Sequence, residues 1–205
     1  MRLVSRCLCV WVGLAAAGSL WAQGPDIEGL IASLSDPKPE LRLESARELA
    51  KLGAKPMNRL LAIIALGEQP AATGATVAVD ALVQDAAAMK AGEERSAVAR
   101  ALVAVAEGGT QLGIRHYALR QLSYVGGDES VAALGRMLED PQVGEMARWA
   151  LARVPGKAAL QALLVALRTS PEPMQVGILN ALGERGDADA VELIADVMDE
   201  ATASA

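Results

Sequence analysis

Three stretches in the second half of the sequence align with one another at offsets of 29 and 31 residues. The alignment superposes four apolar columns, which are Leu122, Leu151 and Leu182; Val131, Leu160 and Val191; Leu134, Leu163 and Ile194; and Leu138, Leu167 and Met198. The loop-like segments GGD, VPGK and ERGD fall between the same columns each time. A unit this short cannot bury its own apolar residues, so the repeat predicts a stack of similar units.

Each aligned block predicts two helices joined by short turns. Residues 129–139, 157–168 and 187–199 carry apolar side chains at i, i+3 and i+7, the spacing of one helix face. Their partners, 142–154 and 173–184, follow the helix-start segments EDPQ and TSPEP. Earlier in the chain the same pattern predicts three further pairs. The second helix of the second pair, AATGATVAVDALVQDAAAMKAG, is expected to be weakened by Gly74.

The sequence therefore predicts an all-α fold, an α-solenoid of about five helix pairs plus a terminal helix. We expect one domain over residues 23–199, followed by a disordered tail over 200–205. Its approximate repeats are 26–53, 56–89, 92–126, 129–155 and 157–185, with a final helix over 187–199. Phe is absent from the chain, so Ala, Leu and Val must make the close contacts between helices.

Residues 1–22 resemble a secretory signal peptide. Arg2 and Arg6 precede an almost wholly apolar run over 7–17, and cleavage is expected after Ala22. The run is shorter than the roughly 20 residues that span a bilayer, so no membrane span is expected after signal removal. Leu20 is larger than the residue usual at that position, which leaves an uncleaved anchor as the alternative. The expected location is the periplasm or the external medium.

Charge and cysteine content exclude several classes of function. The chain has 19 basic and 25 acidic residues, and Arg2 and Arg6 are lost with the signal. An acidic surface repels phosphate backbones, so nucleic acid is not expected as a partner. Both cysteines, Cys7 and Cys9, also lie in the signal, which leaves no thiolate for catalysis or metal binding.

The segments DPKPELRLESARELAKLG, ALRQLSYVGGDESVAALGRMLEDP and ALGERGDADAVELIADVMDE resemble the short HEAT repeats of bacteria, including those of the phycobiliprotein lyases. The resemblance covers nearly the whole chain after residue 22 and is strongest from 113 to 200. It implies a right-handed α-α superhelix of HEAT type. It also implies a binding surface or scaffold, because the family mostly serves in that role.

Two enzymatic relatives are disfavoured. The HEAT-type deoxyhypusine hydroxylase holds two irons with His-Glu pairs, whereas His116 is the single histidine here and Tyr117 follows it. Bilin lyases act on cytoplasmic proteins, which an exported chain would not meet. The sequence contains no G-x-S-x-G, H-E-x-x-H or phosphate-loop motif. We expect no enzymatic activity, no cofactor and no metal.

The second helix of each pair is expected to line the concave face. With Ala118 and Leu122 in the core, residues 116, 120 and 123 lie roughly opposite at 100° per residue. Transferring positions 116 and 120 by the repeat offsets predicts a partner-binding stripe, called the second-helix stripe below. Its members are Leu43, Arg47, His116, Arg120, Glu145, Trp149, Val176 and Asn180.

The expected function is a non-catalytic scaffold of the cell envelope that binds a protein or peptide on this stripe. Two alternatives stay open, an accessory subunit that positions substrate for an envelope enzyme and a purely structural spacer. Trp149 and His116 also have structural interpretations that involve no partner. Trp149 would cover a helix of the adjacent repeat, and His116 would be a solvated helix residue. The sequence does not identify the partner or the oligomeric state.

Overall fold

A computed structural model of the chain describes residues 25–188 and 190–203, and in this part the chain is all-helical, with eleven helices and no strand. The predicted signal peptide lies outside the described residues. The helices are α1 (Ile27–Ser33), α2 (Pro39–Ala50), α3 (Met57–Leu66), α4 (Ala71–Ala88), α5 (Glu93–Gly108), α6 (Leu112–Val125), α7 (Asp128–Met137), α8 (Gly144–Arg153), α9 (Lys157–Thr169), α10 (Glu172–Arg185) and α11 (Ala190–Ala203).

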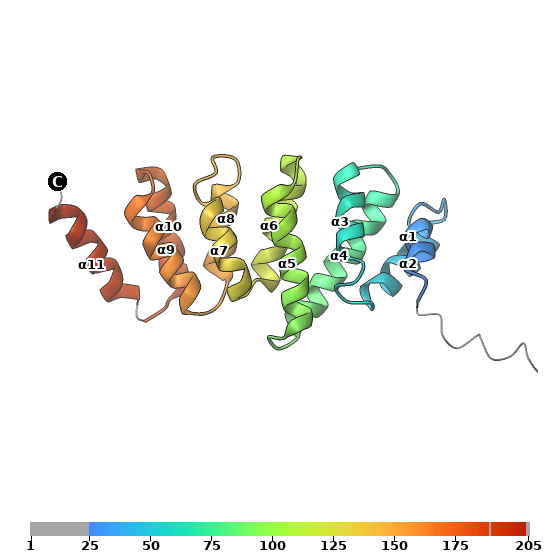
Figure 1. Cartoon of the computed structure of the whole chain (residues 1–205), viewed down its shortest axis with the longest axis horizontal. Helices are drawn as coiled ribbons and strands as arrows, with labels where there is room; N and C mark the ends of the chain where they lie inside the picture. The colour runs from blue at the N-terminus through green and yellow to red at the C-terminus, as the bar shows by residue number, and fades with distance from the viewer. Residues whose placement is uncertain (1–24, 189, 204–205) are drawn as a thin grey trace, which may run out of the picture.

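The helices are arranged as a row of pairs along the long axis of the molecule (Figure 1). Each odd-numbered helix from α1 to α9 packs against the even-numbered helix that follows it. The even-numbered helices also contact one another in order from α2 to α10, and the odd-numbered ones do so from α3 to α11. The result is two parallel rows, one of even-numbered and one of odd-numbered helices. The helix α11 extends the odd-numbered row, and no helix in the described residues follows it as a pair partner.

Local sequence signals account for several helix ends. The Asp26 carboxylate accepts a hydrogen bond from Gly29 N at 3.0 Å and caps the start of α1. Pro39 opens α2, where the missing N–H costs nothing. Gly67 ends α3 with φ +72°, a left-handed conformation that glycine adopts without strain.

The end of the chain differs from the expectation of a last helix over 187–199 and a disordered tail from residue 200. The helix α11 begins later, at Ala190, and continues to Ala203. Arg185 holds the Asp187 carboxylate at 2.7 Å and the Asp187 carbonyl accepts from Ala190 N, so Asp187 stays in the turn. The alanines in ATA favour continuation of the helix past the predicted end.

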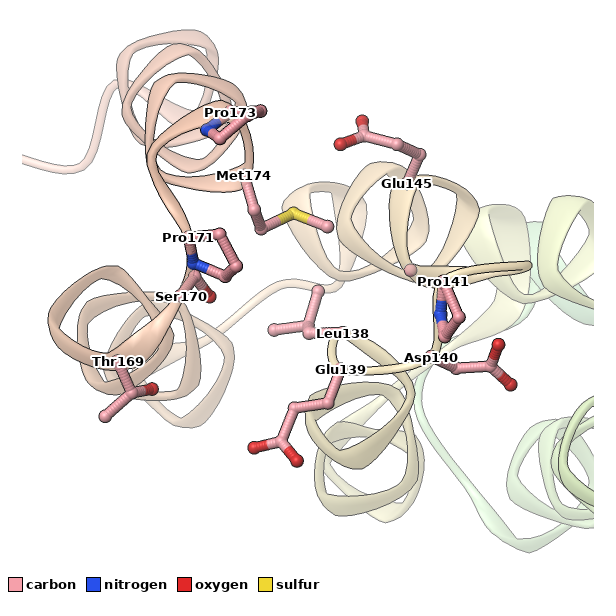
Figure 2. Close-up of a pocket in the computed structure, with 11 residues that line it drawn as sticks. Leu138, Glu139, Asp140, Pro141, Glu145, Thr169, Ser170, Pro171, Pro173 and Met174 are labelled. Atoms are coloured by element: carbon pink, nitrogen blue, oxygen red, sulfur yellow. The ribbon is translucent and has the colours of Figure 1, made fainter.

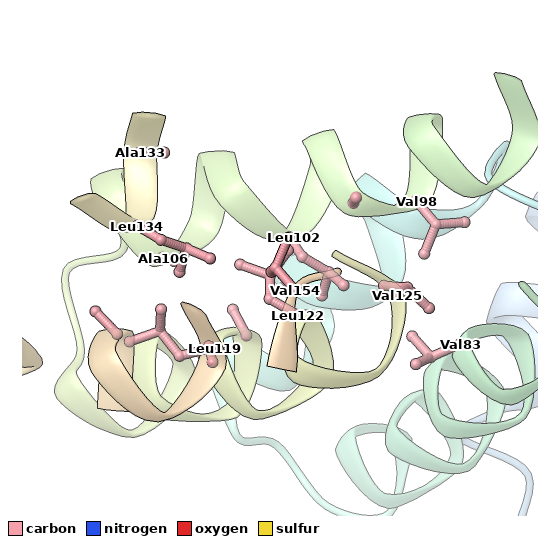
Figure 3. Packing of buried hydrophobic residues seen from close by; sticks show 14 of the residues in the cluster. Val83, Val98, Leu102, Ala106, Leu119, Leu122, Val125, Ala133, Leu134 and Val154 are labelled. Atoms are coloured by element: carbon pink, nitrogen blue, oxygen red, sulfur yellow. The ribbon is translucent and has the colours of Figure 1, made fainter. Parts of the chain in front are cut away.

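The core runs through the whole stack and consists mainly of Leu, Val and Ala side chains, with a few Met and Ile side chains among them. Figure 3 shows how it joins neighbouring pairs: Leu102 of α5, Leu122 of α6 and Val154 after α8 meet in one cluster. Each of these three side chains is at most 1% exposed. Alanines such as Ala106 and Ala133 lie among them and let the helices approach closely. Apolar burial across pairs therefore supplies the stability that one pair lacks.

Three of the four predicted apolar columns have their described members in the core, but one column fails at its last position. Val131 and Leu160 are buried, whereas Val191 is 73% exposed. Val191 lies on α11, which packs on α9 and has no paired helix within the described residues. A residue can match a repeat column in sequence and still be exposed when its structural neighbour is missing.

Gly74 does not interrupt α4, although its helix propensity predicts a weak point. It is buried, and a β-carbon at this position would lie 3.1 Å from Leu34 Cδ2. The missing side chain leaves room for Leu34, which is fully buried after α1. Packing of the first pair on the second thus offsets the local cost of glycine.

Partly buried arginines tie helix ends together, both within a pair and between neighbouring pairs. Arg95 Nε, on α5, donates to the carbonyl of Val125, the last residue of its pair partner α6, at 3.0 Å. Arg115 Nε donates to the Ala106 carbonyl at 2.8 Å, and its Nη2 pairs with Asp140 in the next pair at 2.7 Å. These guanidinium groups satisfy carbonyls that a helix leaves without an internal partner at its C-terminal end.

None of the helices in residues 25–188 and 190–203 combines the length and apolar character needed to cross a membrane.

Candidate functional site

All eight residues of the second-helix stripe lie on even-numbered helices. Leu43 and Arg47 are on α2, His116 and Arg120 on α6, Glu145 and Trp149 on α8, and Val176 and Asn180 on α10. His116 and Trp149 are half-buried and the other six are exposed. Among the described residues, no hydrogen bond or ion pair joins two members of the stripe.

Several stripe residues are engaged within the array. His116 Nε2 lies 2.9 Å from the carbonyl of Gln142, in the turn before α8. Glu145 pairs with Arg148 one helical turn later at 2.9 Å. The Arg153 guanidinium lies over the Trp149 ring, 4.1 Å from its centroid, and therefore covers one face of the indole.

Position 123 departs from the helical-wheel expectation. Ser123 is buried, and its hydroxyl donates to the Arg120 carbonyl at 2.7 Å. The neighbouring helices α4 and α8 flank α6 on both sides. A helix inside a stack therefore has a narrower exposed face than an isolated amphipathic helix would have.

The most developed polar cluster on the even-numbered helices lies between α4 and α6. Asp80 Oδ1 accepts two hydrogen bonds, one from the Tyr117 hydroxyl and one from Gln121 Nε2, each at 2.8 Å. The Arg120 guanidinium lies 5.5 Å from the centroid of the Tyr117 ring. Two donors thus hold one carboxylate oxygen of Asp80 in place.

The same contacts set the protonation state of Tyr117. Burial raises the pKa of the Tyr117 phenol well above its ordinary range, and the hydrogen bond to Asp80 and the charge of Asp80 raise this pKa further. The nearby Arg120 cation opposes the rise without reversing it. The phenol therefore stays protonated at neutral pH and serves as a fixed donor to Asp80 rather than as a base.

An open pocket of about 400 Å³ lies over this cluster. This pocket is called the α4–α6 pocket below, and it is lined by Asp80, Val83, Gln84, Arg120, Gln121 and Tyr124. The Tyr124 side chain is 56% exposed beside the pocket. One carboxylate, one guanidinium and one phenol thus face solvent together, an arrangement suited to polar recognition and contact with an aromatic ring.

Sequence reasoning placed Arg120 in the stripe but missed Asp80, Tyr117, Gln121 and Tyr124. The stripe was transferred by repeat offsets, and no offset used for the transfer reached α4. A local signal was present, because Asp80 is the one acidic residue within the apolar run VAVDALV. A carboxylate amid core residues requires polar partners, and these come from the next even-numbered helix.

Within the described part of the chain, no group of three or more His, Cys, Asp or Glu side chains is arranged to hold a metal ion. No protein-family model matches the sequence. No curated protein is significantly similar to it.

Proposed function

We propose that this chain is a non-catalytic scaffold that binds a protein or peptide partner on the exposed side of its even-numbered helices. The observation that carries the proposal is the α4–α6 pocket, where Arg120 and Tyr124 stand beside an Asp80 carboxylate already held by two donors. Arg and Tyr are enriched among residues that dominate binding energy. A preorganised polar group also loses little conformational entropy on binding.

We further propose that the stack is a HEAT-type superhelix. The support is the resemblance of the repeated segments together with two rows of helices, in which each helix contacts its counterpart in the next pair. Such an array offers a long surface made of similar units, and it binds extended partners by adding contacts from one repeat to the next.

Export to the cell envelope or the medium is the third element of the proposal, and residues 1–22 support it by sequence alone. Sequencing the N-terminus of the protein recovered from its source cells tests it. A chain that begins at Gln23 is expected. A chain that retains Met1 would contradict cleavage and favour an anchored form.

The binding proposal is tested by capture from the source cells' envelope fraction with three immobilised proteins. These are the wild type, Arg120→Glu in the pocket, and Arg100→Glu as a control of identical charge change on α5. Arg100 is exposed and pairs with Glu93. Both residues lie on α5, in the row of odd-numbered helices and not in the row that carries Arg120. We expect a protein that is enriched by the wild type and the control and at least tenfold depleted with Arg120→Glu.

Equal capture by all three proteins would overturn the assignment of the binding face. Capture of nothing by any of them would favour the structural spacer. Circular dichroism of the two variants must match that of the wild type, so that loss of binding is not loss of fold.

A further inference from the structure

A second pocket, distant in sequence from the first, lies where two neighbouring turns meet. The turn between α7 and α8 and the turn between α9 and α10 enclose an open space of about 530 Å³, called the turn pocket below (Figure 2). It is lined by Leu138, Glu139, Asp140, Pro141, Gly144, Glu145, Thr169, Ser170, Pro171, Pro173 and Met174. Of these residues only Glu145 belongs to the second-helix stripe.

The walls of the turn pocket are apolar and stiff. Figure 2 shows Pro171 from the α9–α10 turn and Met174 from the first turn of α10 on one side, and Leu138 and Pro141 from the α7–α8 turn on the other. Proline rings fix the backbone, so the space is largely formed before a ligand arrives. The Met174 side chain is unbranched and half-buried, which lets it adjust to an aliphatic group.

The pocket offers few hydrogen-bond donors. Three lining residues are prolines, which have no backbone N–H. Six other lining N–H groups already donate to carbonyls of their own turns, namely those of Leu138, Glu139, Asp140, Gly144, Ser170 and Met174. No lysine, arginine or histidine lines the space. An anionic ligand would therefore find little to bind.

Acceptors, in contrast, surround the pocket. Asp140 and Glu145 are each paired with an arginine, Arg115 and Arg148 respectively. Glu139 is exposed, and its carboxylate has no ion pair or hydrogen bond with another described residue. The Arg115 guanidinium and the Gln142 N–H hold the pKa of Asp140 below its usual range, so this carboxylate stays charged. The rim of the pocket is acidic and its floor is aliphatic.

The space also continues beyond one side chain. A smaller open groove of about 300 Å³, called the α7–α9 groove below, lies between α7 and α9 and shares Leu138, Glu139, Thr169 and Ser170 with the turn pocket. It adds Val165 and Ala162 as apolar contacts, and it is also lined by Arg136, whose guanidinium pairs with Glu107 at 2.6 Å. Two adjoining spaces that share four lining residues fit an extended chain better than a compact small molecule.

We infer that the turn pocket receives a lysine or arginine side chain of a peptide segment whose flanking apolar residues lie in the α7–α9 groove. The aliphatic stem packs on Met174, Leu138 and the prolines, and the cationic head reaches the Glu139 carboxylate at the rim. This division matches how such side chains bury their stems and keep their charge at a polar edge. The inference does not depend on the α4–α6 pocket.

The methyl group of Met174 allows a direct test. In protein labelled with ¹³C at the methionine methyl groups, the Met174 resonance is identified by its loss in Met174→Leu. The probes are the acetylated, amidated tripeptides Leu-Lys-Leu and Leu-Glu-Leu. We expect saturable movement of the Met174 resonance with the lysine peptide at millimolar concentration. Met57, fully buried in α3, serves as the internal reference that stays fixed.

The dependence of peptide binding on charge distinguishes the inferred site from non-specific apolar binding. Glu139→Gln is expected to raise the Kd of the lysine peptide by about threefold, as for an exposed ion pair. Glu44→Gln, an equal charge change on exposed α2, should leave it unchanged. No movement of Met174 up to about 10 mM peptide, equal movement with both peptides, or an equal effect of both substitutions would each overturn the inference.

Discussion

Arg185, the last residue of α10, donates from Nη1 to the carbonyl of Val154 just past α8 at 2.6 Å. The same side chain donates to the carbonyls of Leu151, Ala152 and Gly156 and pairs with Asp187 at 2.7 Å. One guanidinium thus closes the end of a helix in the preceding pair. Only 6% of the Arg185 side chain is exposed, so this residue links two neighbouring repeats through buried hydrogen bonds and is not a surface charge.

Arg185→Ala should destabilise the protein by about 3 kcal/mol. The substitution removes the hydrogen-bond donor to the carbonyls after α8 and to the Asp187 carboxylate. Because the Arg185 side chain is largely buried, water replaces these hydrogen bonds only in part. Arg185→Lys should recover only part of the loss, because an ammonium cannot reach carbonyls on both sides as a planar guanidinium does. Urea unfolding followed by circular dichroism measures both changes.

Arg100→Ala is the matched control for this experiment. Its ion pair with Glu93 is exposed on both sides, so a loss below about 1 kcal/mol is expected. Equal losses for Arg185→Ala and Arg100→Ala would show that the carbonyl contacts of Arg185 contribute little to stability.

Leu122→Ala should cost about 2–5 kcal/mol. The side chain is fully buried where α5, α6 and the end of α8 meet, so its removal opens a cavity between two pairs. Leu112→Ala, at a position that is 41% exposed on the same helix, should cost less than about 1 kcal/mol. Thermal or urea unfolding of the two variants distinguishes them, and similar losses would contradict the burial of Leu122.

Tyr117 should not ionise in the folded protein near the ordinary tyrosine value of about pH 10. Tyr117 and Tyr124 are the two tyrosines of the chain, so a Tyr124→Phe variant reports Tyr117 alone. Its absorbance in the phenolate band, at about 295 nm, should stay flat through this range while circular dichroism shows a folded chain. An absorbance step at the ordinary value would contradict the raised pKa.

The raised pKa of Tyr117 also sets how stability depends on pH. Below about pH 10 the phenol is protonated in both the folded and the unfolded chain, so it contributes no pH dependence. Above that value the unfolded chain releases a proton that the folded chain retains, and the free energy of unfolding falls as the pH rises. Tyr117→Phe should remove this part of the alkaline loss in urea titrations at about pH 9 and about pH 11.

Arg153→Ala should uncover one face of the Trp149 indole. The guanidinium lies 4.1 Å from the ring centroid and also donates to the Trp149 carbonyl at 3.1 Å. We expect greater acrylamide quenching of the Trp149 emission, isolated by difference from Trp149→Phe, and a loss of about 0.5–1 kcal/mol in stability. Unchanged quenching would show that Arg153 does not cover the ring in solution.

Helix positions and pairing were predictable because their signals are local. Proline and aspartate mark helix starts, glycine marks stops, and apolar spacing marks the buried face of each helix. The eight stripe residues accordingly lie on the even-numbered helices. Exposure was less predictable, because it depends on the neighbours of a helix. Val191 is exposed at the end of the stack and Ser123 is buried between flanking helices.

The two pockets could not be read from sequence periodicity. Asp80 and Tyr117 are 37 residues apart, and their hydrogen bond exists because α4 and α6 are adjacent in the stack. The turn pocket likewise joins two turns whose residues have no helical spacing to reveal them, such as Pro141 and Pro171.

The sequence by itself determined that this chain forms short amphipathic helices and that they repeat, because helix propensity, capping and apolar spacing act within one or two turns of the backbone. Tertiary structure alone decided which polar side chains meet. Asp80 finds Tyr117, Arg185 finds Val154, and the two proline-rich turns enclose a pocket only after apolar burial has brought successive pairs into contact. Polar partners are selected by the distances that this packing imposes, and no short stretch of sequence encodes those distances.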